Sequence, residues 1–119
     1  EGEWSRGLHP GMRFQVLASS LRRNYMMLYI ELDPGAGIPS HDHHGDEEIY
    51  VVSGDLVTEG RLLKAGDFVH ADGGSHHHDL VSPGGCQAIL LTPLTSALAE
   101  AAKRTVKQAS QVVKNSLGL

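Results

Sequence analysis

The chain has 119 residues, a formal net charge of −4 at pH 7, 40% hydrophobic residues and one cysteine. This length is typical of a single domain with its own core, and one cysteine excludes an internal disulfide framework. No apolar run approaches the roughly twenty residues of a membrane span, no signal peptide is visible at the start, and the acidic balance argues against non-specific nucleic-acid binding. We expect a cytoplasmic protein with no membrane or nucleic-acid partner.

Residues 1–92 have the pattern of short β-strands, because apolar, β-favouring stretches alternate with Gly, Pro and Asp turns. The predicted strands are Tyr25–Leu32, Glu48–Val52, Arg61–Lys64, Phe68–Ala71 and Gln87–Leu91. We expect Gly54 to lie in the turn that closes the second strand. For Cys86, a small core residue is favoured over a reactive thiol. Many short strands at regular spacing predict an all-β sandwich or barrel over residues 1–92.

The pattern changes after Pro93. Residues 95–117 contain no Gly or Pro, and their apolar side chains recur at close to helical spacing. Gly118 stands where the residue after a helix is expected. We predict that 93–119 form a C-terminal amphipathic α-helix, packed on the barrel or at a dimer interface. Lys103 and Lys107 could meet an acidic partner, although a solvated face is the simpler interpretation.

Four residues have the chemistry of a divalent-metal site: His41, His43, Glu47 and His77. Side chains alternate faces along a strand, so His41 and His43 share a face, which Glu47 can rejoin if the loop keeps register. His77 comes from a second stretch, thirty residues after Glu47. Neutral imidazoles with one carboxylate suit Zn, Fe(II), Mn, Ni or Co.

Neighbouring side chains compete for these roles. Glu48 adjoins Glu47, but strand parity favours Glu47. The same parity places His76 and His78 on the face opposite His77. His70 could line the mouth of a cavity, and a solvated strand residue is an equally good interpretation.

These residues resemble the motifs of the cupin superfamily. The matching positions are Gly35, His41, His43, Glu47 and Gly54 in its first motif, and Gly66, Gly74 and His77 in its second. Two positions depart from the family pattern: Asp72 stands where proline is usual, and Val81 stands where asparagine is usual. The resemblance implies an all-β fold, the double-stranded β-helix or jelly-roll barrel, around an ion held by His41, His43, Glu47 and His77.

The finer spacing is similar to the ChrR-type cupin, the zinc-binding C-terminal domain of certain anti-sigma factors. Trp4 and Pro10–Met12 resemble the start of that domain. The resemblance suggests one divalent ion, with zinc favoured and Fe(II), Ni or Mn as alternatives, and it suggests a homodimer. In that family a separate N-terminal helical domain binds the sigma factor. A sigma-factor partner is therefore expected only if such a domain precedes Glu1.

Three functions fit these features. The favoured one is a sensory or regulatory metal-binding domain, in which a small-molecule ligand or oxidant reaches the ion. The alternative is a small metal-dependent cupin enzyme of dioxygenase or Lewis-acid isomerase or lyase type, with Tyr50, His70 and His76 as candidate proton carriers. The third is an interaction module with a closed, structural metal site. The sequence leaves open whether the protein is an enzyme.

Overall fold

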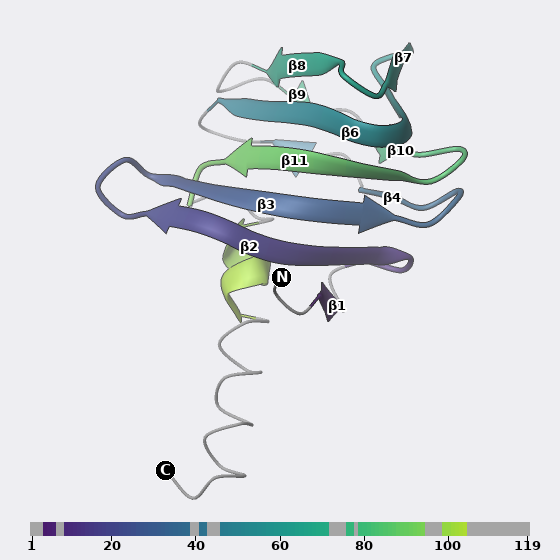
Figure 1. Cartoon of the computed structure of the whole chain (residues 1–119). Coiled ribbons are helices and arrows are strands. Elements are labelled where there is room, and N and C mark those ends of the chain that lie inside the picture. The colour runs from purple at the N-terminus through teal and green to yellow at the C-terminus, as the bar shows by residue number, and fades with distance from the viewer. Residues whose placement is uncertain are drawn as a thin grey trace, which may run out of the picture.

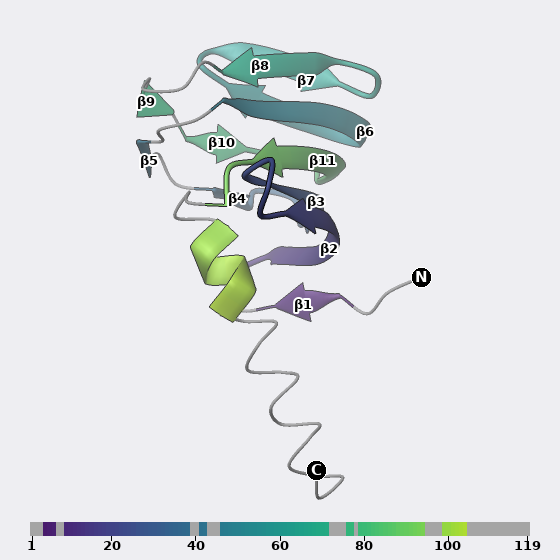
Figure 2. The ribbon, with the colours of Figure 1, turned by 90° about the vertical axis from the view of Figure 1, so that its left-hand side faces the viewer.

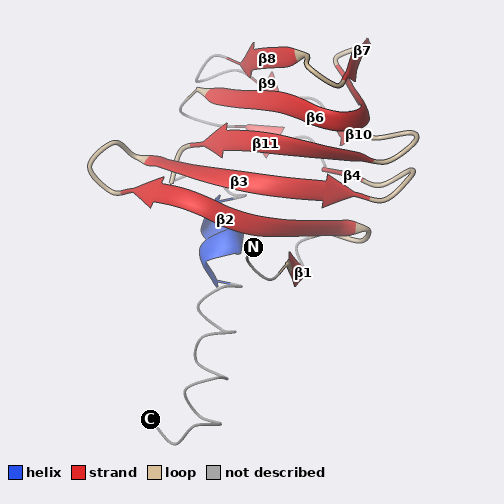
Figure 3. Ribbon diagram, in the orientation of Figure 1, coloured by secondary structure: helices blue, strands red, loops and turns tan. Residues whose placement is uncertain are grey.

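The computed structural model describes residues 4–6, 9–38, 41–42, 46–71, 76–77, 79–94 and 99–104. Its strands are β1 (Ser5–Arg6), β2 (Met12–Ser20), β3 (Tyr25–Leu32), β4 (Gly37–Ile38), β5 (His41–Asp42), β6 (Glu47–Thr58), β7 (Arg61–Lys64), β8 (Phe68–Ala71), β9 (His76–His77), β10 (Leu80–Val81) and β11 (Cys86–Thr92). Residues 99–104 form a short helix. The fold is therefore all-β with one C-terminal helix, as the sequence predicts (Figure 3).

Antiparallel pairing joins nine of these strands into one sheet, in the order β1-β2-β3-β11-β6-β10-β4, with β7 and β8 also paired to β6. The long strands β2, β3, β11 and β6 lie side by side with β8 in one layer (Figure 1). Strands β4 and β10, and the separate pair β5–β9, lie behind this layer and come to its side in the turned view (Figure 2). The sheet curls into the half-open barrel of a jelly roll.

Period-two alternation separates the inner face of this sheet from its outer face. Along β3, every second residue from Met26 to Leu32 is buried, and β11 alternates in the same way from Cys86 to Thr92. The largest fully buried apolar side chains come from four strands: Phe14, Leu28, Ile30, Leu32, Ile49, Val51, Leu56 and Leu90. The core is therefore the filled interior of the curled sheet.

The helix at 99–104 covers part of this interior beside β2 (Figure 2). Ala99 and Ala102, three positions apart on one helical face, are fully buried in the same hydrophobic cluster as the barrel residues. Of the helix predicted over 93–119, residues 95–98 and 105–119 lie outside the described residues, and Pro93 and Leu94 are not helical. The division at residue 92 stays a prediction. Among the residues that the structure describes, no helix is long and apolar enough to cross a membrane.

An apolar row crosses the outer face of the sheet. Tyr29 pairs with Ile89, Ile89 with Tyr50, and Tyr50 with Phe68, so one side chain from each of four adjacent strands stands in line. Trp4 continues the row, because its ring lies 5.4 Å from that of Tyr29 at a tilted angle. Aromatic pairs at this separation are mutually attractive. The Trp4 contact ties the start of the chain to the outer face.

Strand β6 does not end where the sequence predicts. The expected strand stopped at Val52, with Gly54 in the following turn, but β6 continues through Gly54 to Thr58. Its pairing with β11 shifts by one residue between Gln87 and Ala88, which marks a β-bulge just before Gly54. Beyond this point β6 pairs with β7 and β10 instead. Gly54 is therefore a bend inside one strand, not the end of it.

Other boundaries agree more closely with the sequence. Strands β3, β7 and β8 have the predicted limits, and β11 is one residue longer at each end. Strand β2 was not predicted. Its alternation breaks where the register shifts between Val16 and Ala18, and Val16 and Leu17 are both partly exposed.

We predict that Gly54→Ala destabilises the fold more than Gly60→Ala does. Both glycines have positive φ, +81° and +75°, so alanine costs about 1–2 kcal/mol of backbone strain at either position. A Cβ at Gly54 would also overlap the carbonyl oxygen of Gly85, whereas nothing lies within 4 Å of a Cβ at Gly60. Denaturant unfolding should show an additional loss of about 1–3 kcal/mol at Gly54. Equal losses would contradict the close approach of β6 to the 85–86 backbone.

Candidate metal centre

Two predicted histidine ligands lie on paired backbones. Strand β5 pairs antiparallel with β9, and in this register His41 lies opposite His77 and Asp42 opposite His76. Directly opposed residues of an antiparallel pair have Cα atoms about 4.5–5.5 Å apart. The fold therefore brings together two positions that are far apart in the sequence. His43 lies outside the described residues.

Glu47, the predicted carboxylate ligand, is the first residue of β6 and is only 2% exposed. The hydroxyl of Thr92 donates a hydrogen bond of 2.7 Å to its Oε2 atom, and Thr92 itself is 1% exposed. Burying a carboxylate is costly unless it is paired or hydrogen-bonded. A carboxylate buried among the mostly apolar side chains of the described interior is thus a feature that the packing alone does not explain.

The neighbouring Glu48 lies on the opposite face. Its carboxylate is 3.0 Å from Nδ1 of His70, and the carboxylate of Asp46 lies 3.5 Å from Nε2 of the same ring. These side chains are partly or largely exposed. The choice of Glu47 over Glu48, made from parity, agrees with this separation of inner from outer side chains.

Two of the candidate proton carriers face away from the barrel interior. Tyr50 is 44% exposed and lies in the apolar row of the outer face. His70 is the solvated strand residue that the sequence allowed, in contact with Glu48 and Asp46. This placement favours structural roles for Tyr50 and His70 over the alternative in which they carry protons for a metal inside the barrel. For His76, only the backbone pairing of β9 is described.

The donor set fits a divalent cation. Glu47 would supply a buried carboxylate oxygen, the pairing of β5 with β9 brings the positions of His41 and His77 together, and zinc and its neighbours accept imidazole with carboxylate. No group of three His, Cys, Asp or Glu side chains able to hold a metal occurs among the described residues, which do not include His43. Thr92 was missed by sequence reasoning, because the predicted strand stopped at Leu91 and a threonine at a strand end carries no signal.

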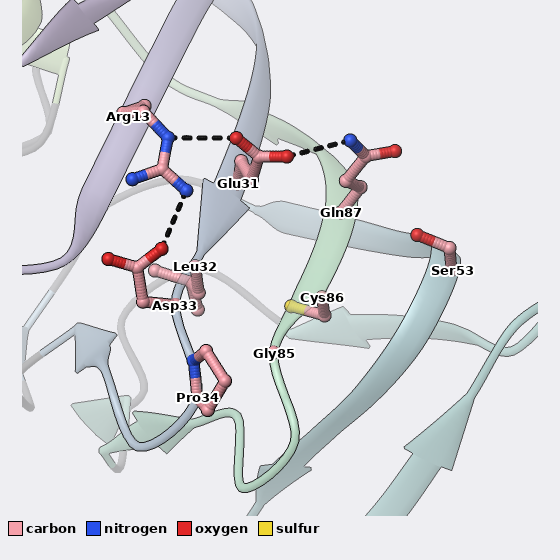
Figure 4. A pocket seen from close by; sticks show the side chains of 9 residues that line it. All are labelled: Arg13, Glu31, Leu32, Asp33, Pro34, Ser53, Gly85, Cys86 and Gln87. Atoms are coloured by element: carbon pink, nitrogen blue, oxygen red, sulfur yellow. Dashed lines mark hydrogen bonds and ion pairs between the residues drawn. The ribbon is translucent and has the colours of Figure 1, made fainter.

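A hollow of about 310 Å³ lies on the outer face, away from Glu47 (Figure 4). Its polar members form a row across four strands, because Arg13 pairs with Glu31, Glu31 with Gln87, and Gln87 with Ser53. Arg13 binds Glu31 and Asp33 at 2.8 Å each, and the Gln87 amide donates to Glu31 at 2.9 Å. Arg13, Glu31, Asp33 and Gln87 thus form ion pairs and hydrogen bonds with one another. We interpret these side chains as a structural clasp that joins β2, β3 and β11.

Charge and burial set the ionisation of this clasp. The Gln87 hydrogen bond, followed by that from Arg13, lowers the pKa of Glu31 below its ordinary value. Hydrogen bonds to Asp33 and then Glu31 raise the pKa of Arg13. Cys86 borders the hollow, but it is 5% exposed and burial raises the pKa of its thiol. The interpretation of Cys86 as a core residue rather than a reactive thiol agrees with this placement.

The family is decided by a match over most of the chain. Residues 1–93 match the family described as the ChrR Cupin-like domain. The chain belongs to this cupin family. No match was found among curated proteins. The cupin double-stranded β-helix inferred from the two motifs is thereby confirmed as the fold.

Solved structures support the same fold. The cupin domain is similar to a Ralstonia eutropha protein with a cupin-like fold, at 23% identity and a TM-score of 0.72 over 89% of this chain and 83% of that one. It is similar to the anti-sigma ChrR of Rhodobacter sphaeroides, solved in complex with SigE, at 26% identity and a TM-score of 0.66 over 77% and 49% of the two chains. It is also similar to an acetylacetone dioxygenase from Acinetobacter johnsonii, at 21% identity and a TM-score of 0.65 over 76% and 62%. The chain thus spans less than two thirds of the length of the latter two proteins.

For the outer clasp of this cupin domain, we predict an acid-sensitive contribution from Glu31. Its pKa is lower in the folded than in the unfolded chain, so its stabilisation is present above the unfolded value and is lost as the pH falls through the folded value. Glu31→Gln should cost about 0.5–1 kcal/mol at pH 7 and nothing below the folded pKa. Urea unfolding from pH 7 to pH 3 measures this, with Glu59→Gln in the exposed β6–β7 turn as control. A cost independent of pH would show that the negative charge of Glu31 does not contribute to stability.

Proposed function

We propose that this cupin domain binds one divalent metal ion through His41, His43, Glu47 and His77. The observation that carries the proposal is the buried carboxylate of Glu47, which stands on the inner face six positions after His41 along the chain. The pairing of His41 with His77 supports it, because β5 and β9 place these two positions directly opposite each other although they come from separate parts of the sequence. Zinc is the favoured ion, and Fe(II), Ni or Mn are alternatives with the same ligand chemistry.

We propose a sensory or regulatory role for the metal centre. The likeness to the anti-sigma ChrR favours this role, since that protein was solved in complex with SigE. The outward orientation of Tyr50 and His70 removes two of the three residues that a catalytic role would have used as proton carriers. A small-molecule ligand or oxidant would act at the ion, and a sigma factor would be the partner only through a further domain preceding Glu1. We also propose that the protein forms a homodimer and resides in a reducing, cytoplasmic compartment.

The metal site is tested by measuring metal content. Protein purified without added metal should hold about one ion per chain, and His77→Ala and Glu47→Gln should each weaken binding by more than about tenfold, because each removes a ligand. His70→Ala is the matched control, since this histidine lies on the outer face and should leave binding unchanged. Wild-type protein without metal under metal-replete conditions, or full binding by His77→Ala, would overturn the assignment.

The role is tested by asking whether the ion can accept another ligand. A sensory or catalytic centre keeps an open position, whereas a structural site is closed by its protein ligands. We expect azide to change the visible spectrum of the Co(II)-substituted protein. An unchanged spectrum would indicate a purely structural site. Rapid metal-dependent turnover of a small organic molecule would favour the enzyme alternative instead.

A further inference from the structure

We propose that Thr92 is the positioning residue of the metal centre, holding the carboxylate of Glu47 in the orientation that the ion requires. The inference rests on the proposed metal function and adds a residue that belongs to neither cupin motif. It is carried by the 2.7 Å hydrogen bond from Thr92 Oγ1 to Glu47 Oε2. The two residues are 45 positions apart in the sequence, so only the folded sheet brings them together.

The sheet register fixes where Thr92 stands. Strand β11 lies between β3 and β6, and Thr92 pairs with Met26 of β3. On the other side Leu91 pairs with Glu48, so the next step of the antiparallel ladder sets Thr92 beside Glu47. Glu47 in turn pairs with Ala71 of β8. The hydrogen bond thus lies at one edge of the layer, where β3, β11, β6 and β8 begin or end.

Burial gives the contact its strength. Thr92 and Glu47 are 1% and 2% exposed, so water competes little for either group. At 2.7 Å the hydroxyl–carboxylate contact has the length of a well-formed hydrogen bond, and such a bond is stronger still when the carboxylate is ionised. Threonine is also stiff at χ1, because its Cβ is branched. A donor fixed in this way can hold the carboxylate without adding conformational freedom.

Outer partners of this kind matter to metal sites in general. Hydrogen bonds that orient a ligating side chain fix its direction, and their loss typically weakens metal binding by about 10–100-fold. The inner face offers a natural comparison in Thr58. It is 2% exposed, and its buried hydroxyl has no hydrogen-bond partner among the residues that the structure describes. Among these residues, removing the hydroxyl of Thr58 therefore breaks no hydrogen bond to a proposed metal-ligating side chain.

The experiment measures zinc affinity by competition with a chelator on the full chain, well below the unfolding temperature. Thr92→Val should weaken zinc binding by about 10–100-fold, and Thr92→Ser, which keeps the hydroxyl, should restore binding to within a few-fold of wild type. A second comparison is between Thr92→Ala and Thr92→Ser, because alanine and serine differ only by the hydroxyl. Thr58→Val is the matched control and should bind zinc like the wild type.

A merely structural role predicts a different result. In that case Thr92→Val, Thr92→Ala and Thr92→Ser would bind zinc as the wild type does, whatever their effect on the stability of the metal-free protein, and the positioning role would be overturned. Equal weakening by Thr92→Ser and Thr92→Ala would also overturn it, because the hydroxyl would then be irrelevant. Failure of the wild-type protein to bind zinc or any other divalent ion is a separate outcome, which overturns the proposed function and the positioning role with it.

Discussion

The pairing of β6 is the constraint on which the rest of the molecule depends. This strand pairs with β8 and β11 along its first part and with β7 and β10 along its second. The change of partners occurs at Gly54, where the backbone of β6 passes against Gly85 too closely for any side chain. One strand therefore belongs to both sides of the curled sheet. The position of Glu47 at its start follows from that arrangement.

The same arrangement separates the charged and polar side chains of the outer face from the mostly apolar side chains of the inner face. Polar and charged groups of the outer face, such as Arg13, Glu31 and His70, find partners on neighbouring strands and remain in contact with water. The inner face is apolar except for a few groups that include Glu47 and Thr92. A carboxylate placed among apolar side chains lowers stability unless something stabilises its charge. The Thr92 hydroxyl meets part of that need, and a bound cation would meet more of it.

Local patterns predicted much of this fold, and they failed where tertiary contacts decide. Strands β3, β7 and β8 were predicted with their observed limits, because uninterrupted β-favouring residues are bounded there by turn residues. Strand β2 was missed because a bulge breaks its alternation, and β6 was shortened because Gly54 has the same sequence signature in a turn and in a bend. Parity placed Glu47 and Glu48 on opposite faces, as the structure shows, and the role of Glu47 as a metal ligand stays a prediction. Thr92 could not be found, since its role depends on a register that no local pattern contains.

The burial of Cys86 has a further consequence for how this protein can be studied. The sulfur belongs to β11, between β3 and β6, and the residue is only 5% exposed. Because the reactive form is the thiolate, and burial disfavours that form, a thiol reagent should modify Cys86 mainly when the sheet opens at the start of β11. The rate of labelling would therefore report how often this end of the sheet opens, without the introduction of any probe.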